Sequence, residues 1–191
     1  MSVLVNDKVS SLSTLIRERR SIRDFKSDPI PTEEVISLLN DAVYAPNHGK
    51  REPWRFIIFE GEGKKTFADA VIQTYTTEQK EKKADNMMKY YQDIPLHLLV
   101  VMPEDPRQKK WEEDMCATSA MVQNFQLLAW EKGMGVCWKT NAYNLDPSFR
   151  EAVGVKPGEK IVATLHIGYY DIVPKAKKRT MVEDKLVVIN K

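Results

Sequence analysis

The chain has 191 residues, enough for a single domain, 1–191, with a continuous core. Hydrophobic residues make up 42% and charged residues 29%, which argues against disorder and against a fibrous protein. Because 29 Lys and Arg residues barely exceed 27 Asp and Glu residues, the formal net charge of +2 disfavours a general nucleic-acid-binding protein.

Two cysteines, Cys116 and Cys137, stand far apart and outside any CxxC motif, which indicates neither a disulfide framework nor a zinc site. The N-terminal segment lacks the pattern of an export signal. No apolar run approaches the roughly 20 residues of a membrane span. We therefore expect a cytoplasmic protein with no membrane partner and no bound metal.

Hydrophobic periodicity and turn residues predict the elements in chain order. The predicted helices cover residues 13–20, 33–43 with Thr32 as cap, a charged and mobile excursion at 64–91, then 112–132 and 147–153. The predicted strands cover residues 54–59, 96–102, 134–139, 161–169 and 186–189.

Helices that alternate with few strands favour an α+β sandwich around one central sheet. The 112–132 helix carries apolar residues on more than one stripe, among them Met121, Val122 and Phe125. A small chain covers such a helix incompletely, so we expect a second subunit to cover the rest.

The first candidate site is the run Arg19-Arg20-Ser21-Ile22-Arg23, which follows the first helix. Guanidinium groups and a serine hydroxyl match the oxygens of a phosphate. The same cations could instead be a solvated helix end that complements the helix dipole. Both interpretations stay open on these residues alone.

Two further segments are candidates for ligand contact. The loop at 45–53, dense in hydrogen-bonding side chains, could line the edge of a planar heterocycle, although Trp54 after it suits a core position and His48 suits an exposed loop. Residues 133–140 place Trp138-Lys139-Thr140 at the end of a strand, where ligands meet sheets, although a helix end and a strand need no ligand. We interpret His97 and His166 as satisfied core histidines, Cys116 and Cys137 as packing residues, and the charged run 78–83 as a solvated helix face.

Taken together and in this order, "RRSIRDF", "APNHGKREPWRFIIFEGEG", "KKWEEDMCATSAMVQNFQLLAWEKGMGVCWKT" and "LHIGYYDIVPKAKKR" resemble the FMN-dependent nitroreductase family. The segments most resemble its short, single-domain NAD(P)H nitroreductase branch. The resemblance implies an α+β sandwich with a mixed, mostly antiparallel sheet flanked by helices. It also implies an obligate homodimer with one FMN in each of two interface clefts.

Carried over by position, the resemblance implies the cofactor-binding residues. The phosphate would be held by Arg19, Ser21, Lys178 and Arg179, with Arg20 at the ribityl chain and Arg23 near the N1/O2 edge of the ring. Contacts from the loop of the partner subunit, or from the strand end beside the ring, would come from Tyr44, Asn47, His48, Trp138, Lys139 and Thr140. The chain departs from the family at Lys50-Arg51-Glu52, where asparagine-x-glutamine is common, at Asn47, where an aspartate or serine is expected, and at Tyr44, where the nearest branch has arginine.

The resemblance implies an oxidoreductase that takes hydride from NADH or NADPH and reduces nitro compounds, quinones or similar small acceptors by a ping-pong mechanism. No side chain need act as a general acid; the protein would contribute binding, orientation and the Arg23 charge. Three alternatives stay open. The same fold could perform enone reduction, dehalogenation or flavin breakdown; the chain could be a non-catalytic flavin-binding or redox-sensing module; or it could be an interaction protein without cofactor.

Overall fold

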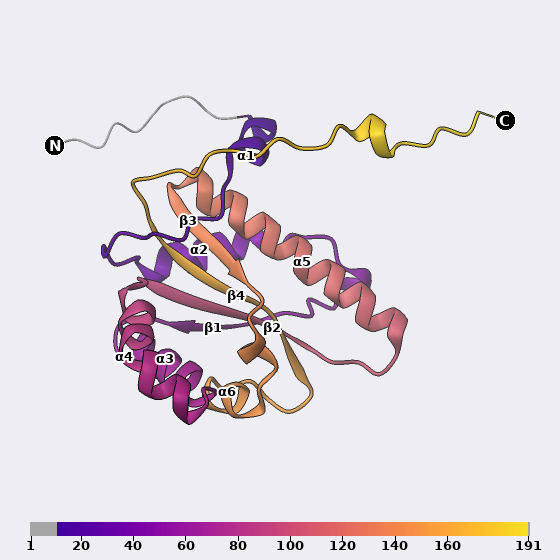
Figure 1. Ribbon diagram of the computed structural model, residues 1–191. Coiled ribbons are helices and arrows are strands. Elements are labelled where there is room, and N and C mark those ends of the chain that lie inside the picture. The colour runs from indigo at the N-terminus through magenta and orange to yellow at the C-terminus, as the bar shows by residue number, and fades with distance from the viewer. Residues whose placement is uncertain (1–10, 191) are drawn as a thin grey trace.

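The computed structural model describes residues 11–190. One four-stranded sheet, in the order β1-β2-β4-β3, forms the centre of the molecule, and all three strand pairs are antiparallel (Figure 1). The strands are β1 (Arg55–Phe59), β2 (Leu96–Pro103), β3 (Met134–Lys139) and β4 (Glu159–Tyr169). A single parallel bridge adds Ser21 to the outer edge of β3 at Val136.

Helices cover both faces of this sheet, as Figure 1 shows. They are α1 (Leu12–Glu18), α2 (Thr32–Ala42), α3 (Gly63–Gln73), α4 (Thr77–Asp93), α5 (Gln108–Glu131) and α6 (Pro147–Ala152), with short 3₁₀ turns η1 (His48–Lys50), η2 (Ala142–Leu145) and η3 (Val182–Lys185). Helices α2 and α5 pack on one face, whereas α3, α4 and α6 pack on the other. The predicted α+β class is therefore confirmed.

Two buried clusters fill the space between the layers. Strand β2 contributes to both of them, because Leu98 and Val100 face α2 and α5 while Leu99 and Val101 face α3 and α6. A strand that is buried on both faces reads as a continuous apolar run, which explains why its position could be predicted from the sequence. Within the described residues, none of the helices is long and apolar enough to cross a membrane.

The segment at 64–91 was predicted to be a charged, helical and mobile excursion; its helical character is confirmed, but it is not a single excursion from the body. It forms the two helices α3 and α4, and α3 buries Phe67, Ala68 and Val71 against the sheet. Phe67 stacks on the His97 ring with centroids 4.2 Å apart. The charged run at 78–83 lies on α4, mostly exposed as expected.

Two smaller predictions also fail. Thr32 does not cap α2: Pro31 occupies the cap position, and the Thr32 hydroxyl donates a hydrogen bond to the Glu60 carboxylate instead. Residues 186–189 form no strand. After Asp171 every residue up to 190 is exposed, and in Figure 1 this C-terminal tail leaves the body beside α1.

Much of the apolar surface of α5 is covered by its own chain. Val122 and Phe125 are wholly buried in the cluster beneath α2. These two residues therefore lie in the core of the single chain, whereas Leu127, Leu128 and Trp130 of the same helix are only partly buried. The second subunit expected to cover the helix stays a prediction. Exposed apolar side chains lie instead on α1 and on the tail, as Leu12, Ile16, Met181, Val182 and Leu186 to Ile189.

Candidate functional site

Two facing glycines seat the segment that follows α1. Gly135 on β3 is opposite Gly168 on β4. A Cβ on Gly135 would lie 2.6 Å from the Cβ of Ile22, and one on Gly168 would lie 2.8 Å from the Cβ of Phe25. The Ile22 N–H also donates to the Val136 carbonyl at 3.3 Å. The absence of two side chains thus fixes where the Arg19–Arg23 cluster lies.

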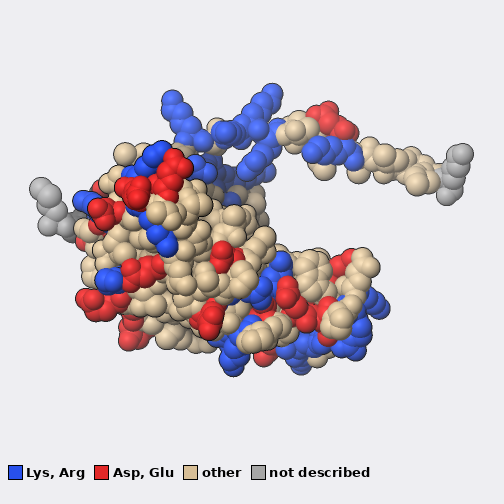
Figure 2. Space-filling view, turned by 60° about the horizontal axis from the view of Figure 1, so that its bottom comes forward, with Lys and Arg blue, Asp and Glu red and all other residues tan. Residues whose placement is uncertain are grey.

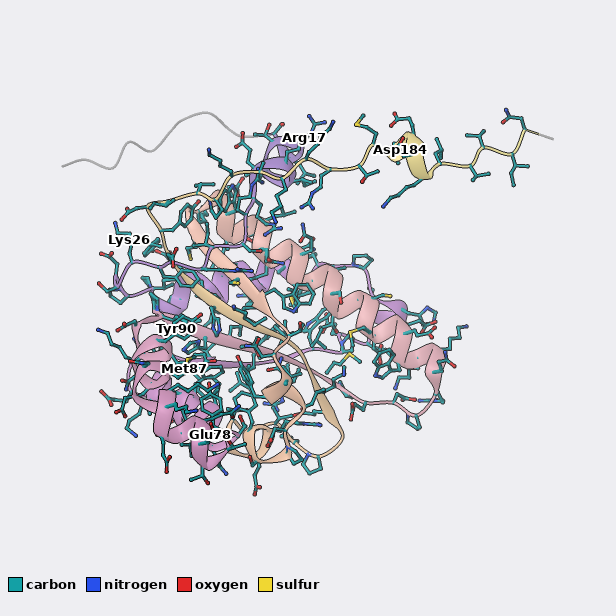
Figure 3. All side chains as sticks on the ribbon, in the orientation of Figure 1. Arg17, Lys26, Glu78, Met87, Tyr90 and Asp184 are labelled. Atoms are coloured by element: carbon teal, nitrogen blue, oxygen red, sulfur yellow. The ribbon has the colours of Figure 1, made fainter. Side chains whose placement is uncertain are left out.

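This seating places a basic pocket at the edge of the sheet. The pocket has a volume of about 510 Å³ and lies between the end of α1 and the start of the tail. Its lining includes Arg17, Arg19, Arg20, Ser21, Lys175, Lys177 and Arg179. In Figure 2 the Lys and Arg side chains gather where the tail meets the body, and Figure 3 shows Arg17 on α1 beside that tail.

The cations in this pocket are incompletely paired. Over residues 11–190, Arg19 Nη1 and Arg20 Nε are buried and have no hydrogen-bond partner. Burial, together with the charges of Arg20 and Arg179, lowers the pKa of Arg19. A buried donor without an acceptor is costly, and neighbouring like charges add to that cost. An anion with several oxygens would satisfy both groups.

Arg20 also supports the helix end, because its Nη1 donates to the carbonyls of Arg17 and Arg19 at 2.6 and 2.8 Å. The two interpretations of the basic run are therefore compatible: Arg20 closes α1 while its Nε is buried without a hydrogen-bond partner among the described residues. The tail contributes Lys175, Lys177 and Arg179 to the pocket lining, but not Lys178. The sequence prediction missed the two lysines, although the alternation of an extended chain brings 175, 177 and 179 to one side.

The predicted loop contacts lie elsewhere in the chain. Tyr44 is 87% exposed, His48 is exposed, and Asn47 is half-buried between α2 and β1. Asn47 uses its side chain inside the loop, where its Oδ1 accepts from the Glu52 N–H at 3.0 Å. This loop lies beside the N-terminal end of α5, where Arg51 pairs with Asp114.

The basic pocket lies near the opposite end of α5. Leu12 and Leu15 of α1 line one groove with Leu128 and Glu131, near the last turn of α5. Asp114 and Glu131 are 17 positions apart in this helix, which corresponds to roughly 25 Å along its axis. One chain therefore does not bring the His48 loop and the Arg19 pocket together.

The remaining predicted residues follow the edge strand. Trp138 and Thr140 line a pocket of about 360 Å³ at the end of β3, and the Trp138 indole N–H donates to the Val162 carbonyl at 3.3 Å. Lys139 is half-buried. Arg23 is exposed. Burial raises the pKa of the nearby Tyr90 phenol, and the positive charge of Arg23 partly opposes this rise.

His97 and His166 are core residues, as expected, and they contact each other. Their Nδ1 atoms are 2.7 Å apart, and His97 Nε2 donates to the Tyr91 carbonyl at 2.8 Å. His97 Nδ1 therefore accepts from His166. In the described part of the chain His166 Nε2 is buried without a partner.

An antiparallel sheet between two helical layers, with a basic pocket at its edge strand, defines an α+β sandwich protein suited to an anionic ligand. The chain belongs to the nitroreductase family, whose model matches residues 16–169. It is 40% identical over 181 residues to the Bacillus subtilis protein named "Putative NAD(P)H nitroreductase YfhC". The aligned residues cover 92% of this chain and 93% of that protein.

Solved structures agree on the fold. The crystal structure of a nitroreductase-like family protein from Bacillus cereus has a TM-score of 0.91 and 43% identity, and the match covers 94% of this chain and 96% of that one. Oxidized iodotyrosine deiodinase bound to FMN and 3-iodo-L-tyrosine has a TM-score of 0.70 and 22% identity over 95% of this chain and 100% of that one. The second likeness concerns the fold alone.

Proposed function

We propose that this chain is an FMN-dependent oxidoreductase that takes hydride from NADH or NADPH and reduces a small oxidised acceptor, such as a nitro compound or a quinone. The observation that carries the proposal is the basic pocket with two buried, unpartnered guanidinium nitrogens. The name of the B. subtilis relative and the FMN in the deiodinase structure support it.

The residues of the pocket fit a phosphate monoester. Arg19 and Arg179 would neutralise its charge, and the Ser21 hydroxyl would add a neutral donor. Arg20 Nε would be available to the same group or to the chain beyond it. Lys175 and Lys177 supply further positive charge in the lining, and Lys178, which lies outside it, stays a predicted phosphate contact.

When bound, FMN supplies the ring through which a hydride passes from donor to acceptor. The part of this chain is to bind, orient and stabilise charge. Arg23 is an exposed cation next to the phosphate cluster in sequence, and it would stabilise negative charge at the pyrimidine edge of the ring. The strand end at Trp138 to Thr140 would provide the backbone beside the ring.

We propose one shared site for donor and acceptor. Gly133 ends the turn after α5, and Met134 and Gly135 already belong to β3, so this helix-to-strand order is the reverse of a dinucleotide-binding fingerprint. We therefore expect no separate nucleotide site. Donor and acceptor would then bind in turn. Parallel initial-rate lines across acceptor concentrations are expected, whereas converging lines would indicate a ternary complex.

We further propose that the site is completed by a second copy of the chain. The His48 loop and the Arg19 pocket lie near opposite ends of α5, farther apart than one mononucleotide extends. An apolar groove of about 450 Å³ between α1, α2 and α5 is lined by Leu12, Leu15, Leu127 and Leu128. Such a groove and the apolar tail are typical of a homodimer interface.

The identity of the cofactor is tested by releasing it from the purified protein with heat and separating it by chromatography. We expect FMN at about one per chain, because the pocket suits one terminal phosphate. Release of FAD would contradict the proposal. So would a colourless protein that stays colourless after incubation with FMN and desalting.

A further inference from the structure

The loop between α2 and β1 holds an unusual backbone. Gly49, Lys50 and Glu52 all have positive φ, at 64°, 48° and 47°. Glycine adopts this region freely, but a lysine and a glutamate do so at a cost of about 1 kcal/mol or more each. Two such residues within three positions persist only where surrounding contacts hold them.

Two sets of contacts hold this loop. From inside, Asn47 bridges it, with Nδ2 donating to the Ala45 carbonyl at 3.2 Å and Oδ1 accepting from the Glu52 N–H. From outside, Arg51, between the two strained residues, reaches α5. Its Nε and Nη2 donate to Asp114 Oδ1 at 2.9 and 2.7 Å, and Nη2 donates to Glu113 Oε2 at 2.9 Å.

The ion pair between Arg51 and Asp114 is largely buried, so it should contribute more to holding the loop than an exposed ion pair would. The Asp114 side chain is 5% exposed, so its charge depends on Arg51 for compensation. A planar guanidinium that contacts two carboxylates also fixes direction, which a lysine would not do. The pair ties the loop rigidly to the first turns of α5.

The residues presented by this clamp are His48 and Lys50, both exposed at the apex. His48 lies close enough to Glu113 for its charge to help lower the pKa of that carboxyl, after the larger effect of the Arg51 hydrogen bond. Arg51 itself is directed toward α5 and makes no contact with the basic pocket lining.

We propose that Arg51 is a positioning residue for the flavin site: its clamp on Glu113 and Asp114 holds the strained loop so that His48 is preformed to contact FMN. This rests on the proposed function, in which His48 reaches the cofactor of the partner subunit. Preforming the loop saves the entropy of ordering it during binding. Arg51 therefore acts on the cofactor only through His48.

The test measures the Kd of FMN by quenching of flavin fluorescence in Arg51→Gln, His48→Ala and the double variant. We expect Arg51→Gln to raise the Kd about tenfold and Arg51→Lys to raise it less. In the His48→Ala background, Arg51→Gln should add no further increase, because the residue through which it acts is gone. A merely structural role would instead give additive effects.

Arg55 offers a matched control. Its Nε donates to Glu159 Oε1 at 2.8 Å, and its side chain is 35% exposed against 26% for Arg51. Arg55→Gln should remove a comparable ion pair and leave the Kd of FMN unchanged. If Arg51→Gln does not fold, Arg51→Lys carries the same comparison.

Wild-type protein that binds FMN while both Arg51 variants keep the wild-type Kd would overturn the positioning role alone. Additive effects of Arg51→Gln and His48→Ala would do the same. Wild-type protein that binds no FMN would overturn the proposed function as well, so the two failures are distinguishable.

Discussion

At the scale of single residues, Arg19 is the most informative group in the basic pocket. Its Nη1 is buried without a partner among the described residues, and its pKa is lowered by burial and by Arg20 and Arg179. Arg19→Ala should weaken FMN binding by roughly 1.5–3 kcal/mol, the loss expected for a hydrogen bond to a charged group. Titration of the apoprotein with FMN measures the change. An unchanged Kd would show that the phosphate is held elsewhere.

The histidine pair predicts how stability depends on pH. Burial lowers the pKa of His97 from 6.5 to about 4 and that of His166 well below 6.5. Well above pH 6.5 these histidines are neutral in the folded and in the unfolded chain. As the pH falls toward 4, the histidines of the unfolded chain take up protons, whereas those of the folded chain do not. The free energy of unfolding should therefore decrease as the pH is lowered from 6.5 to 4. His97→Gln should reduce the slope of this free energy against pH. Urea unfolding at several pH values, with a slope unaltered by that variant, would contradict the assignment.

At the scale of elements, the glycine pair on β3 and β4 seats the segment that carries the basic cluster. Gly135→Ala places a methyl group 2.6 Å from Ile22, so the segment must shift. We expect a loss of about 1–3 kcal/mol in stability together with weaker FMN binding. Gly63→Ala is the control, since its Cβ would meet only the Phe59 Cβ at 4.0 Å. Equal unfolding midpoints and FMN affinities for the two variants would refute the seating role.

Most elements could be predicted from the sequence because each has a strong local pattern. The predicted helix at 112–132 and strand at 96–102 correspond to α5 and β2, which begin or end within four residues of the prediction. The failures have non-local causes. Segment 64–91 is charged overall, yet Phe67 and three further apolar side chains of α3 reach the sheet. The apolar run at 186–189 has strand composition, but it lies in the exposed C-terminal tail and pairs with none of the four strands.

The candidate site was predictable in composition but not in layout. The basic run after α1 could be identified by charge alone, and the resemblance placed Arg179 with it. The roles of Gly135 and Arg51 depend on residues far away in sequence: Gly168 and Ile22 for one, Asp114 for the other. Such contacts have no local signal, so no pattern of residue types could have indicated them.

At the scale of the whole molecule, the proposed dimer would bring together the Arg19 pocket of one chain and the His48 loop of the other. Leu12 is 64% exposed in the groove between α1 and α5, so Leu12→Glu should leave the single chain folded. In a dimer it would bury a carboxylate near Asp41 and Glu131 and should weaken association. Sedimentation with absorbance at protein and flavin wavelengths should show monomer and loss of FMN together. A folded Leu12→Glu monomer with one FMN per chain would refute the shared site. Asn86→Glu adds the same charge at an exposed position of α4 and serves as the control, which should stay dimeric.

The central claim is that this fold and its basic pocket serve a flavin that cycles between a nicotinamide donor and a small acceptor. The most direct measurement follows the visible absorbance of the purified, FMN-loaded protein under anaerobic conditions. We expect the flavin band to bleach on addition of NADH or NADPH and to return on addition of a nitroaromatic compound or a quinone. A protein that binds FMN but keeps its full absorbance with both donors would contradict the account and indicate a non-catalytic flavin-binding module.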